Sequence, residues 1–97
     1  MGMDTVPTGI VTGTAGSLVA LPVTNVVPAT GNLVLAAGVY VLYGMGANTT
    51  YKVFDGTAWQ TLVAAGGIAP VIYSDGISFR FENAAGANQN AVTQKIG

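Results

Sequence analysis

The chain has 97 residues, no cysteine and no histidine, and only seven charged side chains, three basic and four acidic. The missing residues exclude a disulfide framework and a zinc–thiolate site, and they remove the side chain that most often titrates near neutral pH. The formal net charge of −1 offers no basic footprint for nucleic acid or for an anionic membrane surface.

Residues 1–31 are rich in Gly, Thr, Val and Pro. This composition disfavours helix, so we expect an extended, nearly charge-free N-terminal arm with one short strand over Ser17–Leu21. The densest apolar run, Leu33–Met45, has 13 residues, whereas a membrane-spanning helix needs about 20. The N-terminus also lacks the basic residues of a signal peptide. We therefore expect no membrane partner.

From residue 32 onward, short runs of Val, Ile, Tyr, Phe and Thr alternate with turn residues. Closely spaced runs of this kind predict an all-β domain, an antiparallel β-sandwich or small barrel with a jelly-roll-like arrangement, over residues 32–97. The expected strands are Asn32–Leu35, Val39–Tyr43, Thr50–Phe54, Ala58–Val63, Val71–Ser74, Ile77–Glu82 and Ala91–Ile96. The expected core residues are Val39, Val41, Val53, Leu62, Ile72, Phe79 and Phe81.

Two Asp-Gly pairs, Asp55-Gly56 and Asp75-Gly76, lie between β-rich runs. Asp and Gly tolerate the positive φ angles of a type I′ turn, so each pair predicts a two-residue hairpin loop. The sequences around the two pairs also resemble each other. This likeness fits an internal duplication or, as we favour, two hairpins built under the same constraints.

A two-residue loop fixes the register of each hairpin. In the second hairpin it places Ile72 opposite Phe79, on the face that points to the core. In the first it places Lys52 opposite Trp59, where the ammonium group would lie over the indole ring.

The titratable residues form no pattern that predicts catalysis, a cofactor or a metal. Nucleophilic catalysis needs a base beside the nucleophile, and without His or Cys only a serine–lysine pair is available. Among candidate carboxylate pairs, Asp55 and Asp75 are explained by their turns and Glu82 by a partner in Arg80. Calcium needs clustered oxygen ligands, and the carboxylates are scattered singly. We therefore expect a non-enzymatic protein.

Three segments resemble small bacteriophage virion proteins and tail-fibre modules. Tyr51–Leu62 contains a D-G-x-x-W hairpin, Ala36–Leu42 contains A-G-V-Y at a strand start, and Ser74–Phe81 repeats the Asp-Gly pattern. The likeness covers roughly residues 30–97. It implies a virion role as a capsid decoration (cement) protein or as a fibre or head–tail component. Proteins of this kind commonly form trimers and clamp neighbouring capsid subunits.

The charge content supports a protein that other subunits cover, because 7% of residues are charged against roughly a quarter in typical soluble domains. We expect a homo-oligomer, a trimer by the resemblance, bound to the major capsid protein or another virion protein at the capsid surface. The alternative is a tail-fibre or receptor-binding module whose aromatic residues recognise host glycans. Aromatic residues and arginine are enriched at interfaces. The candidate interface residues are Trp59, Tyr43, Tyr73, Arg80 and Glu82.

Overall fold

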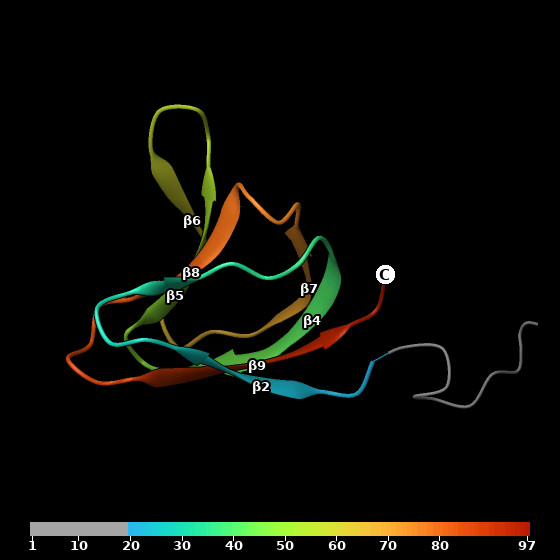
Figure 1. The fold of residues 1–97 in the computed structure, drawn as a ribbon, viewed down its shortest axis with the longest axis horizontal. Coiled ribbons are helices and arrows are strands. Elements are labelled where there is room, and N and C mark those ends of the chain that lie inside the picture. The colour runs from blue at the N-terminus through green and yellow to red at the C-terminus, as the bar shows by residue number, and fades with distance from the viewer. Residues whose placement is uncertain (1–19) are drawn as a thin grey trace, which may run out of the picture.

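The computed structural model describes residues 20–97, and this part of the chain forms eight β-strands and no helix. The strands make two four-stranded sheets (Figure 1). The first, called the β4 sheet, has the order β2 (Val23–Val27), β9 (Gln89–Lys95), β4 (Gly38–Met45), β7 (Ala69–Ser74). The second, called the β5 sheet, has the order β3 (Asn32–Leu33), β8 (Phe79–Asn83), β5 (Thr49–Phe54), β6 (Trp59–Val63).

All neighbouring strands are antiparallel, and the chain passes repeatedly from one sheet to the other. Counted along the described residues, the β4 sheet contains the first, eighth, third and sixth strands, and the β5 sheet contains the second, seventh, fourth and fifth. This is the eight-stranded arrangement of a jelly roll. The predicted antiparallel sandwich is therefore confirmed.

All seven strands predicted from residue 32 onward are present, and their ends differ from the prediction by two residues at most. Within the range expected to form the arm, residues 1–31, Val23–Val27 forms β2 and pairs with β9 over its whole length, and residues 1–19 lie outside the described part of the chain. The β-branched valines and threonine of this segment suit a strand even between two prolines. Most of the strand expected over Ser17–Leu21 lies outside the described residues.

The core lies between the sheets and is centred on aromatic side chains. Tyr51 and Phe81 are fully buried, with their ring centroids 4.6 Å apart. Burial raises the pKa of Tyr51 to about 12, and its hydroxyl donates a hydrogen bond to the backbone carbonyl of Tyr73. The buried hydrophobic residues are Val27, Leu35, Tyr40, Leu42, Tyr51, Ile72, Phe81 and Ala91.

The prediction assigned the wrong face of β4 to the core. Tyr40 and Leu42 are buried between the sheets, so Val39 and Val41 point to the opposite face and are half-buried there. The reason is that Val39, Tyr40, Val41 and Leu42 are all apolar. Strand alternation separates two faces, but it does not show which face is buried when both carry apolar side chains.

The remaining core predictions are partly correct. Ile72 and Phe81 are buried, whereas Val53 and Phe79 are only partly buried. The prediction that Leu62 lies in the core was wrong, because its side chain is 53% exposed. It is skipped by the β5–β6 register at a bulge, and its strand belongs to a hairpin that extends away from the body of the sandwich (Figure 1).

The first Asp-Gly pair forms a hairpin, but with a register two residues away from the prediction. Phe54 pairs with Trp59, and Lys52 pairs with Thr61 rather than with Trp59. The loop has four residues because the Asp55 carboxylate accepts hydrogen bonds from the backbone amides of Thr57 and Ala58, at 2.8 Å each. A shift of two residues keeps the side chains between the turn and the bulge, Trp59 to Thr61, on their predicted faces.

The second Asp-Gly pair does not form a hairpin within a sheet, so this prediction was wrong. β7 pairs with β4, and β8 pairs with β3 and β5, so Asp75-Gly76 leads the chain from one sheet to the other. Ile72 consequently lies opposite Tyr40 in β4, not opposite Phe79. The buried Ser74 explains the crossing, because its hydroxyl donates to the Leu35 carbonyl at 2.8 Å and fixes the end of β7.

Candidate interaction surfaces

The structure divides the five predicted interface residues between opposite faces of the sandwich. Tyr43 and Tyr73 are exposed on the outer side of the β4 sheet, next to the buried Leu42 and Ile72, and the Tyr73 ring also lies edge-on to Phe79, with the ring centroids 6.4 Å apart. Trp59, Arg80 and Glu82 lie together on the outer face of the β5 sheet. The two groups therefore belong to two separate surfaces with different chemistry.

The outer face of the β5 sheet carries a group of paired charges, Lys52, Arg80 and Glu82, here called the ionic cluster. Arg80 donates to Glu82 Oε2 from Nε at 2.9 Å and from Nη2 at 2.7 Å. Lys52 Nζ lies 3.0 Å from Glu82 Oε1. Arg80 Cζ also lies 3.8 Å from the centre of the Trp59 ring. The prediction that Lys52 lies over this indole was wrong: the cation there is Arg80, because the register pairs Lys52 with Thr61.

The electrostatics of the ionic cluster favour a charged, structural Glu82. Its partial burial raises the pKa, but hydrogen bonds and charges from Arg80 and Lys52 outweigh burial and hold the pKa below the ordinary value. A general acid near neutral pH needs the opposite shift. Trp59 has one ring face against Arg80 and the Phe54 ring tilted beside it at 5.4 Å. This contact leaves less of the indole free as a stacking platform.

No charged side chain of the four strands points to the outer face of the β4 sheet, because Lys95 of β9 alternates with the outward residues and pairs with the buried Tyr40. We call this surface the uncharged face. Strand alternation and register place its residues. Tyr43 and Tyr73 are 49% and 62% exposed, and the Tyr43 hydroxyl donates to Gln94. The residues of the uncharged face are Thr24, Val26, Val39, Val41, Tyr43, Val71, Tyr73, Asn90, Val92 and Gln94.

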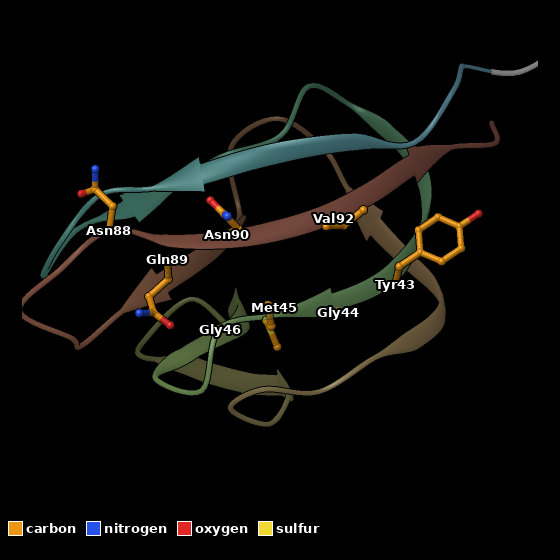
Figure 2. A pocket seen from close by; sticks show the side chains of 8 residues that line it. All are labelled: Tyr43, Gly44, Met45, Gly46, Asn88, Gln89, Asn90 and Val92. Atoms are coloured by element: carbon orange, nitrogen blue, oxygen red, sulfur yellow. The ribbon is translucent and has the colours of Figure 1, made fainter.

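A shallow hollow lies at one end of this sheet, between β4 and the start of β9 (Figure 2). A register shift between Leu42 and Gly44 changes the pairing of β4 with β9 beside it. Gly46 favours close packing there, because a Cβ at this position would lie 2.8 Å from the Gln89 Cβ and would force the two segments apart. The hollow is lined by Tyr43, Gly44, Met45, Gly46, Asn88, Gln89, Asn90 and Val92. Its polar groups are neutral amides and a phenol, which suit hydroxyl or peptide groups rather than ions.

The two Asp-Gly turns lie away from both faces, and each aspartate is fully exposed. Hydrogen bonds from backbone amides hold the pKa of Asp55 and of Asp75 below its ordinary value. Within residues 20–97, no group of three Asp, Glu, His or Cys side chains is placed to hold a metal ion. None of the described elements is a helix long and apolar enough to cross a membrane.

Sequence reasoning missed the exposed valines of the uncharged face, among them Val26 and Val71. For Val71 the signal was its alternation with Ile72, a predicted core residue. Val26 fell in the expected arm and had no such signal. The chain matches no protein-family model, no curated protein and no solved structure at a significant level. The surfaces themselves therefore carry the functional argument.

Proposed function

We propose that the chain is a non-enzymatic virion structural protein, a capsid decoration (cement) protein that packs its uncharged face across neighbouring capsid subunits. The observation that carries this proposal is the separation of the two faces. The outer face of the β4 sheet combines exposed tyrosines and valines with half-buried valines and neutral polar side chains, and the ionic cluster occupies the opposite face. Apolar and aromatic side chains without charge are typical of interface centres, and exposed apolar patches mark interaction sites.

The mechanism is mechanical. Covering the uncharged face removes valine and tyrosine side chains from water at a joint between capsid subunits. A protein that binds only the assembled shell stabilises that shell by mass action. Each copy must first offset the entropy lost on association, so many copies act together. The ionic cluster, on the far face, stays in solvent.

Two further observations support the proposal by analogy. Jelly rolls of eight strands occur in viral capsid domains and in lectin domains. The D-G-x-x-W hairpin and the A-G-V-Y strand resemble small phage virion proteins. Fold and resemblance do not define function by themselves, so the chemistry of the face remains the main support.

The test is the melting temperature of capsid shells, measured by calorimetry with and without the full chain. We expect the wild-type chain to bind expanded capsids and to raise their melting temperature. Tyr73→Lys places a charge on the uncharged face and should weaken binding tenfold or more, because an unpaired charge would be buried. Thr61→Lys is the matched control, since Thr61 is exposed on the opposite face. Bound protein that leaves the melting temperature unchanged, or equal binding by both variants, would contradict the proposal.

The second candidate function is a tail-fibre or receptor-binding module for host surface glycans. The hollow in Figure 2 favours it, because three neutral amide side chains and an exposed tyrosine lie around one shallow site. Neutral amides and an exposed aromatic ring on one shallow surface suit a sugar ligand. We expect Tyr43→Ala to abolish glycan binding on a panel, with Thr61→Ala as the control. Wild-type protein that binds no glycan would contradict this function.

A further inference from the structure

Within residues 20–97, the edges of both sheets lack charged residues. The edge strands are β2 and β7 in the β4 sheet and β3 and β6 in the β5 sheet, and none of them contains Asp, Glu, Lys or Arg. The charges that lie in strands are on the inner strands β5, β8 and β9. Natural proteins more often place charges on edge strands, because a free edge presents unpaired N–H and C=O groups to other chains.

Three of the four edges are limited by other features. β3 is only two residues long. β6 has a bulge at Leu62, and β7 contains Pro70 beside a register shift. Short strands, bulges and prolines all hinder pairing with another strand.

β2 has none of these features. Its five residues pair with β9 in an unbroken register, without a bulge, a proline or a charge. Val23 and Val26 are 50% and 53% exposed. Among the described edges, β2 is therefore the one best suited to accept another strand.

We propose that the free edge of β2 pairs antiparallel with β2 of a second copy of this chain, joining two β4 sheets into one continuous sheet. The strand complements itself when the pair is centred on Asn25. Thr24 then lies opposite Val26 of the second copy, and Val23 lies opposite Val27 of the second copy. Cross-strand pairs of β-branched residues are favourable, and no like charges are brought together.

The symmetry of this pairing has a structural consequence. An antiparallel pair of identical strands is isologous, so it closes as a two-fold dimer rather than the trimer expected from the resemblance. Both uncharged faces lie on the same side of the joined sheet and stay free. The pairing therefore does not depend on the capsid proposal.

A disulfide test measures the register directly, because the wild-type chain has no cysteine. Directly opposed residues in an antiparallel pair have Cα atoms about 4.5–5.5 Å apart, within reach of a disulfide. Two copies of residue 24 would be roughly 8 Å apart, which is too far. We expect a mixture of the full-length variants Thr24→Cys and Val26→Cys to give at least fivefold more covalent dimer than either variant alone. Equal cross-linking in all three samples, or none in the mixture, would overturn the proposal.

A mass measurement tests the same edge without cysteine. In sedimentation equilibrium we expect the full chain to reach twice its mass of 9.7 kDa, and Val26→Lys to raise the dimer dissociation constant tenfold or more. Val71→Lys is the matched control, because it places the same charge on the same face at the other edge of the sheet. Its dissociation constant should match that of the wild type.

A wild-type monomer at all concentrations, or a trimer that Val26→Lys leaves intact, would overturn the proposal. Hydrogen exchange gives another outcome that would overturn it. If amides at the free edge of β2 were protected in a monomer at every concentration, the chain's own N-terminal residues would lie on this edge. A chain that dimerises but leaves capsids unchanged would contradict the proposed function alone.

Discussion

The two Asp-Gly turns have the same local structure and different places in the fold. In each, one aspartate oxygen accepts hydrogen bonds from the amides two and three residues later, at 2.8 Å and 2.8 Å for Asp55 and at 2.8 Å and 2.6 Å for Asp75. The glycine that follows has a φ of 99° in the first turn and 83° in the second. Yet the first turn joins neighbouring strands of one sheet, and the second joins the two sheets.

The difference comes from the residue before each aspartate. Phe54 is exposed and packs beside Trp59 at the tip of the hairpin. Ser74 is buried, and its hydroxyl links the second turn to the core by donating to Leu35 and accepting from the Gly76 amide. Turn residues thus set the local backbone, whereas contacts in the core decide which strand the chain pairs with next.

The largest expected effect is at Ser74. Ser74→Ala leaves the Leu35 carbonyl and the Gly76 amide without their partner, and burial makes such a loss costly. We expect a loss of about 2 kcal/mol in the free energy of unfolding, measured by urea denaturation. Thr57→Ala, an exposed change in the first turn, should alter it by less than about 0.5 kcal/mol. Equal losses would show that the second turn gains no stability from the core.

The two glycines test the similarity of the turns. Gly56→Ala and Gly76→Ala each force a side chain onto a positive φ, which costs about 1–2 kcal/mol. A Cβ at Gly76 would lie 3.6 Å from the Ala37 nitrogen, an ordinary contact, and one at Gly56 would meet nothing within 4 Å. We therefore expect equal losses in urea denaturation. A much larger loss at Gly76 would mean that the inter-sheet turn is more tightly packed than its contacts show.

The hydroxyl of Tyr51 provides a second link between the sheets, close to the second turn. Tyr51→Phe removes its hydrogen bond to the Tyr73 carbonyl and should cost about 1 kcal/mol at neutral pH. Since the folded state raises the pKa of Tyr51 from 10.0 to about 12, the wild type should lose stability as pH rises from about 10 to 12. The variant should lose less over that range. Identical alkaline denaturation curves would contradict this role.

These contacts show why the sequence predicted strands better than pairings. Each strand after residue 32 has its own β-branched and aromatic residues, so the strands were predictable locally. Each Asp-Gly pair also marked a turn, but the predicted type I′ was wrong, because the glycine has a positive φ and the aspartate does not. The partner of β7 depends on Ser74 reaching Leu35, a contact between residues 39 positions apart. In the same way, two of the predicted interface residues, Tyr43 and Tyr73, share a face only because β4 and β7 pair.

The smallest expected effect is electrostatic and should be the same in both turns. Backbone amides lower the pKa of Asp55 and of Asp75, so the ionised carboxylates favour the folded state. That contribution is complete above the unfolded-state pKa of about 3.9 and is lost as pH falls below it. Asp55→Asn and Asp75→Asn keep an acceptor oxygen but remove the titration. We expect each variant to flatten the acid limb of stability against pH, followed by Trp59 fluorescence, and by equal amounts. A flatter limb in only one variant would show that the turns differ in their local hydrogen bonds as well as in their surroundings.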